Sequence, residues 1–387
     1  MKPLRHLLVT NDFPPKVGGI QAYLWELWRR LDPGSFVVLT ASSVPDAHAF
    51  DEAAASQGIR IERVPGRILY LPTVDVRARI RSLASEVGAT LVLLDPVLPL
   101  GMVGPRLGIP YGVVLHGAEV AIPARLPVTG GIVGRVLAHA SLVVSAGRYP
   151  AAQAARTLAG RDPGSAPRLV EVPPGVDCAR FAPLAPSARG AARLRLGLPV
   201  DAPVVASVSR LVARKGMDVL IEAVRRLRAS YPDLLLAIAG TGRQAERLAV
   251  QARRVAAPVR FLGRVSEEDK QALLACADVF ALACRTRWLG LEEEGFGIVF
   301  LEAAASGTPQ VAGDSGGVEE AVDDGVTGLV VRTPRDPGAV AGALRRLLAD
   351  ADLRRRMGDA ARARACTTFD YTALAGKLAA ALAEVQG

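Results

Sequence analysis

The sequence predicts an α/β protein with two Rossmann-like domains, each built on a doubly wound parallel sheet, facing each other across a cleft. At 387 residues the chain is longer than a single compact domain usually is. Short apolar runs alternate with helical patterns along the whole length, as they do in repeated βαβ units. A stretch rich in proline and small residues separates two sets of these units, which indicates a linker between two domains.

Residues 1–182 form the first predicted domain. Its strands are expected at the short apolar runs His6–Thr10, Phe36–Thr40, Ile59–Val64, Thr90–Leu94, Tyr111–Leu115, Leu142–Ser145 and Leu169–Val172. Helices are expected between them, and one of these, Ile20–Leu31, carries apolar residues along one face. The repeated change from strand to helix predicts parallel strands with helices on both faces of the sheet.

Residues 194–387 form the second predicted domain, and residues 183–193 form the linker, with Pro183–Ser187 as the expected hinge. Its strands are expected at Val204–Ser209, Leu234–Ala239, Val259–Leu262, Val279–Ala283, Gln310–Ala312 and Gly328–Val331. The last helix is expected to pack back on the first domain. Doubly wound sheets bind ligands at the carboxyl ends of their strands, so the cleft between the domains is the expected site.

The net charge of +9 comes from basic residues that are spread along the chain rather than gathered in a block. Such an excess suits an anionic ligand or an anionic membrane surface and gives no indication of a nucleic-acid partner.

The four cysteines, Cys178, Cys276, Cys284 and Cys366, have unrelated spacings and form no CxxC or metal-binding pattern. We expect them to be reduced. The first apolar run is too short for a secretory signal, and the longest one is broken by Asp95 and two prolines. A cytoplasmic protein is therefore expected, peripheral at most on the inner face of the plasma membrane.

A glycine loop runs directly into an apolar helix at Glu294–Ala303, with carboxylates on either side at Glu294 and Glu302. A helix that begins near Gly297, Ile298 and Val299 offers free backbone N–H groups and a positive dipole end to a diphosphate. The carboxylates can accept hydrogen bonds from sugar hydroxyls on either side of it. The alternative is a glycine loop before a core helix with two solvated glutamates.

Arg210 and Lys215 stand in a predicted strand-to-helix loop, where two cations can neutralise a leaving diphosphate. Alone, such a basic loop is more often a solvated turn. The nearby phosphate-type helix start in the same domain favours the functional interpretation.

In the first domain a predicted strand leads through Asp12 into a Gly-Gly loop at Gly18 and Gly19 that opens a helix. The glycine spacing differs from the GxGxxG dinucleotide fingerprint, but it lets the backbone approach a ligand. His116 follows another apolar strand and is expected at its carboxyl end. A plain turn and a structural histidine are the respective alternatives.

The stretches NDFPPKVGGIQ, SRLVARKG, FLGRV and EGFGIVFLE, in this order, resemble retaining glycosyltransferases of family 4, which have the GT-B fold. The resemblance covers essentially the whole chain. It is greatest to the actinobacterial mannosyltransferases that use GDP-mannose to extend phosphatidylinositol mannoside. Two departures, Ala118 where relatives have histidine and Trp288-Leu289 where they have a glycine-rich run, concern the transferred sugar and the acceptor.

The resemblance implies a hexosyltransferase that needs no metal or other cofactor. Its implied catalytic residues are Arg210 and Lys215 at the leaving phosphate, Glu294 at the transferred sugar, and His116 facing the reacting sugar. For donor binding it further implies Gly19, Val265, Gly297, Ile298, Val299 and Glu302, with Glu302 at the ribose and Val265 near the base. For the lipid or glycolipid acceptor it implies Asp12 and Gln21 together with His116.

Three other functions remain open from the residues. The same fold can transfer another sugar, for example from a UDP-sugar, or use another acceptor. A non-catalytic nucleotide-sugar binder would not need cations placed for a leaving group, and a dinucleotide oxidoreductase would need the missing GxGxxG loop.

A membrane-docking helix is expected at Val76–Val87, since a lipid acceptor requires the enzyme to reach an interface. Its apolar positions follow helical spacing, while Arg77 and Arg81 fall together on another face with Arg79 close by. The alternative is an ordinary surface helix over its own core.

Overall fold

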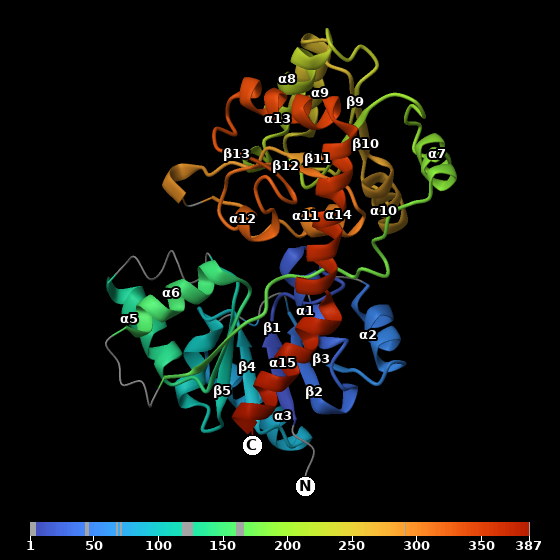
Figure 1. Ribbon diagram of the computed structural model, residues 1–387. Helices are drawn as coiled ribbons and strands as arrows, with labels where there is room; N and C mark the ends of the chain where they lie inside the picture. Colours follow the sequence, from blue (N-terminus) through green and yellow to red (C-terminus); the bar gives the residue numbers. More distant parts are fainter. Residues whose placement is uncertain are drawn as a thin grey trace. The chain divides into compact units, whose positions relative to one another are not determined.

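The computed structural model describes residues 5–42, 46–66, 69, 72–117, 127–159, 166–290 and 292–386. The chain divides into two compact units (Figure 1). Unit 1 comprises Met1–Pro174 and Tyr371–Gly387, and unit 2 comprises Gly175–Asp370. Unit 2 is therefore an insertion in unit 1. Each unit has its own parallel sheet and its own core.

Unit 1 contains a sheet in the order β3-β2-β1-β4-β5-β6-β7, which counts seven strands among the described residues. The strands are β1 (His6–Thr10), β2 (Phe36–Ala41), β3 (Arg60–Val64), β4 (Leu91–Asp95), β5 (Tyr111–Leu115), β6 (Leu142–Ser145) and β7 (Arg168–Glu171). Every neighbouring pair is parallel. The strand order reverses between β1 and β4, where Thr10 stands opposite Asp95. Such a switch point is where doubly wound sheets bind ligands.

Helices cover both faces of this sheet. They are α1 (Gly19–Trp28), α2 (Ala47–Ala55), α3 (Val74–Val87), α5 (Pro127–Ala138), α6 (Arg148–Leu158) and α15 (Tyr371–Gln386), with 3-10 turns η1 (Pro33–Ser35) and η2 (Leu100–Arg106). Leu8 of β1 faces the core shared by α1 and α15, whereas Leu7 and Val9 face the core under α3 and α5. This alternation follows the two-residue period of a strand.

Unit 2 contains a sheet in the order β10-β9-β8-β11-β12-β13, six parallel strands within the described part of the chain. The strands are β8 (Val204–Val208), β9 (Leu235–Ala239), β10 (Val259–Gly263), β11 (Val279–Leu282), β12 (Gln310–Gly313) and β13 (Gly328–Val331). The predicted pair of doubly wound parallel sheets is thus confirmed.

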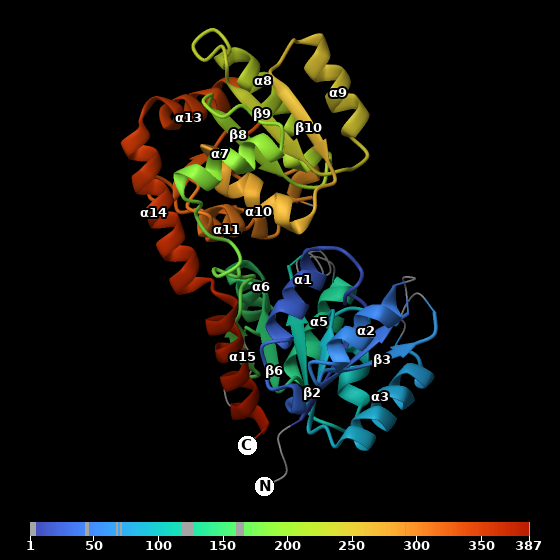
Figure 2. The same cartoon turned by 90° about the vertical axis from the view of Figure 1, so that its right-hand side faces the viewer.

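The helices of unit 2 lie on both faces of its sheet (Figure 2). They are α7 (Pro186–Arg195), α8 (Met217–Leu227), α9 (Ala245–Arg254), α10 (Glu267–Cys276), α11 (Ile298–Ala305), α12 (Val318–Ala321), α13 (Pro337–Ala349) and α14 (Ala351–Thr368), with 3-10 turns η4 (Ala213–Lys215) and η5 (Trp288–Gly290). The helices α7 and α10 share one core, and α8, α11 and α13 contribute to the other. None of the helices among the described residues is long and apolar enough to cross a membrane.

The unit boundaries differ from those expected from the sequence. Unit 1 ends at Pro174 rather than at residue 182, and the expected linker 183–193 belongs to unit 2. There Pro186 is the first residue of α7, a position that suits proline because its missing N–H would have no helical partner. The last helix, α15, belongs to unit 1, where Leu374, Leu378 and Leu382 are buried.

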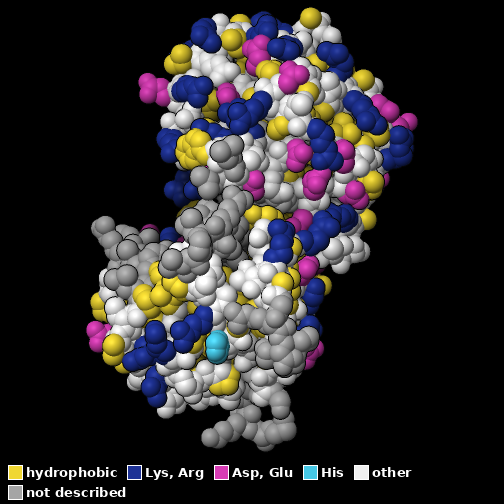
Figure 3. Space-filling model, turned by 90° about the vertical axis from the view of Figure 1, so that its left-hand side faces the viewer, with side chains coloured by type: hydrophobic (Ala, Val, Ile, Leu, Met, Phe, Trp, Pro, Cys, Tyr) yellow, Lys and Arg dark blue, Asp and Glu magenta, His cyan; other side chains and the backbone are white. Residues whose placement is uncertain are grey.

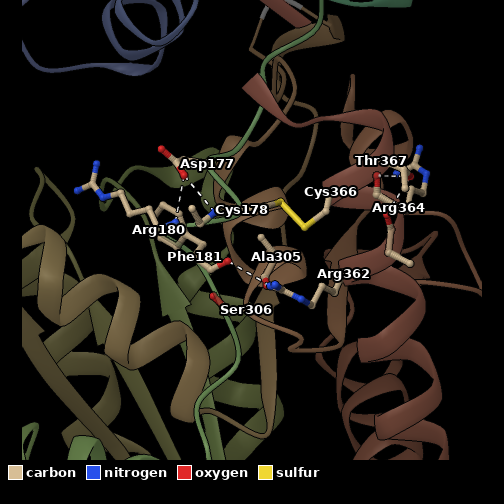
Figure 4. The surroundings of a disulfide bond; sticks show 12 residues. Asp177, Cys178, Arg180, Phe181, Ala305, Ser306, Arg362, Arg364, Cys366 and Thr367 are labelled. Carbon is tan, nitrogen blue, oxygen red and sulfur yellow. Dashed lines mark hydrogen bonds between the residues drawn. A yellow bond between two sulfur atoms is a disulfide. The ribbon is translucent and has the colours of Figure 1, made fainter. Parts of the chain in front are cut away.

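Two cysteines that we expected to be reduced form a disulfide, Cys178–Cys366, with Cα atoms 5.7 Å apart (Figure 4). The backbone N–H of Val176 also donates to the carbonyl of Phe369 at 2.8 Å. The segments on which the chain enters and leaves unit 2 therefore lie side by side. The expectation was wrong because 188 residues separate the two cysteines, so their spacing gave no sign of this pairing. Cys276 and Cys284 are buried free thiols, as expected.

Candidate active site

The start of α11 in unit 2 has the features of an anion site. Its N-cap, Gly297, has φ of 81° and no side chain caps the helix. A Cβ atom on Gly297 would lie 2.7 Å from the ring of Phe300, so both the backbone conformation and the space require glycine. Ile298 and Val299 are half-buried at the first helical positions. The first backbone N–H groups and the positive end of the helix dipole are thus available to a phosphate.

Lys215 forms a buried ion pair with Glu294, with its Nζ 2.6 Å from Oε2 of the carboxylate. Gly216 makes this placement possible, because a Cβ atom there would lie 1.8 Å from the carbonyl oxygen of Ala283. The Cys284 thiol donates to the same carboxylate oxygen at 3.5 Å, and Arg214 Nε lies 3.9 Å from it. Burial works to raise the pKa of Glu294, but the charge of Lys215 outweighs it, so the pKa is lower than usual.

The backbone of Glu294 is fixed by a second glycine loop that the sequence analysis missed. Its N–H donates to Ser315 Oγ at 3.2 Å, and its carbonyl accepts from the N–H of Gly317 at 3.0 Å. A Cβ atom on Gly316 would lie 2.2 Å from the carbonyl oxygen of Glu294, so the two loops pack backbone to backbone. The adjacent glycines after β12 are a signal that could have identified this close approach.

Arg210 and Lys215 were expected to act together, and the structure places them differently. Lys215 is buried and held by Glu294, whereas Arg210 is exposed in the loop after β8. Among the described residues the Arg210 side chain makes no hydrogen bond or ion pair, so it is free to meet an incoming anion. The two cations therefore supply one fixed and one adaptable positive charge.

Glu302 lies in α11, where its carboxylate accepts from Lys270 Nζ at 2.8 Å. Lys270 also pairs with Glu267 at 3.0 Å. Burial works to lower the pKa of Lys270, but Glu302 and Glu267 outweigh it, so the pKa is raised and the charge is kept. Neither Glu294 nor Glu302 is thus a free solvated glutamate. The sequence analysis missed Lys270, which stands in α10 outside every motif.

Val265 follows β10 and is half-buried against the core that α7 and α10 share. Gly263, the last residue of β10, has φ of 66°, which turns the chain at the carboxyl end of this edge strand. The segment implied for base binding is therefore at the same edge of the sheet as the starts of α8 and α11, because all six strands are parallel.

In unit 1 the loop after β1 is closed around Asp12. Its Oδ1 accepts from Gln21 Nε2 at 2.5 Å and from Lys16 Nζ at 2.6 Å. A Cβ atom on Gly18 would lie 2.2 Å from Gln21 Oε1, so a larger residue would displace the end of the Gln21 side chain. Gly19 begins α1 and is exposed, which leaves its backbone accessible.

His116 stands at the end of β5, as expected, and its Nε2 lies 2.8 Å from Asp95 Oδ1. The other oxygen of Asp95 accepts from Thr10 Oγ1 at 2.6 Å, and Thr10 Oγ1 in turn accepts from the N–H of Asp12 at 2.9 Å. The edge of the Tyr23 ring packs on the imidazole, with centroids 5.6 Å apart. A fully buried carboxylate thus fixes the orientation of the imidazole.

The sequence analysis missed Asp95, although it is the last residue of an apolar strand next to β1 and β5. An acidic residue at the carboxyl end of a buried parallel strand is a recognisable signal. The departure at Ala118, and Glu119 beside it, lie outside the described residues. In the described ranges, no three His, Cys, Asp or Glu side chains are grouped as a metal ion would require.

The expected membrane helix corresponds to α3, and its apolar stripe packs on its own sheet. Ile80, Leu83 and Val87 are buried in the core with β1 and β4, and Val76 packs against it. This stripe is therefore not available for insertion into a membrane, and that part of the expectation was wrong. Arg79 and Arg81 remain exposed, and Figure 3 shows Lys and Arg side chains on the surface of each unit.

The chain is similar to known proteins over most of its length. The family described as "Glycosyl transferases group 1" matches residues 189–364. The chain is 41% identical over 379 residues to a GDP-mannose-dependent alpha-(1-6)-phosphatidylinositol monomannoside mannosyltransferase of Mycolicibacterium smegmatis, covering 96% of this chain and 97% of the relative. It is 37% identical over 362 residues to the enzyme of Corynebacterium glutamicum that acts on the monoacylated form, with 92% of each chain covered.

Solved structures share the fold at lower identity. Anabaena Alr3699/HepE in complex with UDP has a TM-score of 0.80 at 22% identity, covering 98% of this chain and 100% of that one. Sucrose-phosphate synthase from Thermosynechococcus elongatus has a TM-score of 0.75 at 23% identity, covering 97% and 98%.

Proposed function

We propose that this chain transfers mannose from GDP-mannose to a phosphatidylinositol mannoside. It belongs to the group 1 glycosyl transferases and, within them, to the family of the GDP-mannose-dependent phosphatidylinositol mannoside mannosyltransferases. The family membership rests on relatives about 40% identical over nearly the whole chain. The observation that carries the activity is the buried Lys215–Glu294 pair in the unit that contains the uncapped start of α11. A fixed cation and a helix N-terminus are what a leaving diphosphate needs.

In the proposed reaction the bond between the mannose anomeric carbon and the GDP β-phosphate oxygen breaks, and negative charge grows on that phosphate. Lys215 meets this charge without having to reorganise, because Glu294 already holds it in place. Arg210 supplies a second positive charge from the same segment between β8 and α8. Free N–H groups of Ile298 and Val299 add the helix dipole. These sources of positive charge support a reaction that does not require a metal, which transfer in excess EDTA would test.

The oxygen of the acceptor hydroxyl forms the new bond to the anomeric carbon, and its proton passes to the departing β-phosphate oxygen of GDP. We assign its surroundings to unit 1, where Asp12, Gln21 and His116 gather at the carboxyl ends of β1 and β5. Asp95 fixes the orientation of the His116 imidazole, which we assign to the reacting sugar. On the donor side we assign Glu302, together with Lys270, to the ribose, Glu294 also to the mannose hydroxyls, and Val265 to the base.

A lipid acceptor requires the protein to work at the inner face of a membrane. Since the apolar side of α3 is packed in its own core, we propose that attachment is peripheral and electrostatic, through exposed arginines such as Arg79 and Arg81. Each basic residue near an anionic surface contributes about 1 kcal/mol, which gives a weak and salt-sensitive attachment.

The deciding experiment measures transfer from a panel of GDP- and UDP-sugars to phosphatidylinositol monomannoside in mixed vesicles. We expect the product only with GDP-mannose and a strong loss with Lys215→Met. Transfer from a UDP-sugar instead would replace the proposed donor. Tight GDP-mannose binding without any turnover would indicate a nucleotide-sugar binder.

A further inference from the structure

A hollow of about 480 Å³ lies between α8 and α9 of unit 2, separate from the Lys215–Glu294 pair. Charged side chains dominate its lining: Asp218, Glu222, Arg247, Arg254, Arg285 and Arg335. Arg247 and Arg254 are seven residues apart on α9 and therefore point from the same face of the helix. None of these six residues belongs to the proposed donor or acceptor site.

The charges around this hollow do not balance. Asp218 pairs with Arg285 at 2.9 Å, and Glu222 pairs with Arg225 of its own helix at 2.6 Å. Both carboxylates are therefore already neutralised. Within the described ranges, Arg247, Arg254 and Arg335 have no carboxylate partner. Three guanidinium groups consequently line the hollow with uncompensated charge.

The partners of these three arginines leave donors available. Arg247 donates to Gln244 Oε1 at 2.9 Å and Arg335 to the carbonyl of Thr286 at 2.8 Å, each with one of its guanidinium nitrogens. The guanidinium of Arg254 has no hydrogen-bond partner among the described residues. Planar guanidinium groups match the oxygens of phosphates, and several around one hollow favour an anion with more than one negative charge.

We propose that this hollow is a second anion-binding site, which takes a soluble anion bearing a diphosphate or two phosphate groups and communicates with the donor site. The connection runs through short backbone contacts. The N–H of Arg285 donates to the carbonyl of Arg214 at 2.9 Å, next to Lys215. Arg335 holds Thr286, whose hydroxyl lies 3.3 Å from that of Ser315, the residue that fixes the backbone of Glu294.

An anion in the hollow competes with Asp218 for Arg285. When Arg285 moves toward the anion, the segment 285–286 moves with it, and so does its hydrogen bond to Arg214. The loop that carries Lys215 is then less firmly held. We therefore expect an anion in the hollow to weaken binding at the donor site, by about fivefold at the lower end of usual coupling strengths.

Calorimetry with inorganic diphosphate, on protein saturated with GDP and without metal ions, tests the site while the donor site is filled. We expect wild type to bind one further equivalent. Arg254→Glu should weaken that binding about tenfold or more, since it removes a charge-assisted hydrogen bond and reverses the charge. Arg253→Glu is the matched control, because Arg253 is an exposed neighbour on α9 that does not line the hollow.

Absence of diphosphate binding by wild type would overturn the proposal. Equal losses of binding in the two variants would also overturn it, since they would show only general attraction to a basic protein.

For the coupling, the Kd of GDP is measured with and without diphosphate. A rise in wild type that disappears in Arg254→Glu supports it, whereas an equal rise in both shows simple competition at the donor site and refutes it. Loss of sedimentation with phosphatidylinositol vesicles in Arg254→Glu but not Arg253→Glu would assign the hollow to a lipid phosphate and refute the soluble ligand.

Discussion

Replacing Lys215 by methionine removes one charge from the centre of unit 2 and keeps most of the side chain's volume. Lys215 and Glu294 are 10% and 8% exposed and their charged atoms are 2.6 Å apart. Breaking a buried pair in this way leaves a buried charge without its main partner, which costs about 3–5 kcal/mol of the free energy of unfolding. The same change removes a preorganised charge from the leaving phosphate, which costs about 3 kcal/mol of barrier, or about a hundredfold in turnover.

A second substitution separates the two effects. In the double variant, which carries both Lys215→Met and Glu294→Gln, the buried carboxylate is absent. We therefore expect it to regain most of the stability that Lys215→Met alone loses. Turnover should stay low, because the charge at the phosphate is still missing. Urea unfolding followed by circular dichroism measures stability, and mannose transfer measures turnover. The reasoning would be refuted if the double variant were as unstable as Lys215→Met. It would also be refuted if Lys215→Met kept a turnover within threefold of wild type.

The pH dependence gives an independent check of the same pair. In wild type the lowered pKa of Glu294 means that its stabilising contribution is present above the usual value of 4.5 and is lost as pH falls through the lower folded value. Without Lys215, burial raises the pKa of Glu294 instead. The buried charged carboxylate then destabilises the folded state above pH 4.5, and protonation relieves this destabilisation as pH falls. The stability gap between wild type and Lys215→Met should therefore narrow from pH 7 to about pH 4.

Three further predictions follow from the assigned roles. Glu302→Ala should weaken GDP binding, whereas Glu294→Ala should weaken GDP-mannose binding much more than GDP binding; calorimetric profiles that are alike for the two variants would contradict the division. Asp95→Asn should lower kcat by about a hundredfold with a small change in melting temperature, since the imidazole of His116 loses its carboxylate partner. An unchanged kcat would contradict the assignment of His116 to the reaction. Replacement of Arg77, Arg79 and Arg81 on α3 by glutamate should abolish sedimentation with anionic vesicles at low salt and leave GDP binding intact. Sedimentation equal to that of wild type would exclude this face of α3 as the membrane contact.

The strands were predictable because each buried parallel strand is a continuous apolar run between turns. The predicted Leu142–Ser145 coincides with β6, and Leu169–Val172 differs from β7 by one residue at each end. The site motifs were found for a similar reason, because Lys215, Gly297 and Glu294 lie in loops directly attached to a strand or helix. Local sequence is enough to identify a loop of that kind.

The features that were missed depend on pairing between distant segments. Lys270 meets Glu302 from another helix, and Ser315 meets Glu294 from the loop after another strand. The Cys178–Cys366 disulfide likewise joins two distant segments, one near the start and one near the end of unit 2. In each case the individual residue is unremarkable in sequence, and only the order of strands in the sheet brings the partners together.

The interruption of unit 1 by unit 2 has a consequence for the chain as it is made. Ribosomes complete domains in order, and the N-terminal one normally folds first. Here residues 175–370 can fold as soon as they emerge, while unit 1 still lacks α15. Until Leu374, Leu378 and Leu382 are synthesised, the apolar side of α1 that they cover stays in water. Translation that stalls shortly before Tyr371 would thus release a chain with unit 2 whole and unit 1 open to aggregation.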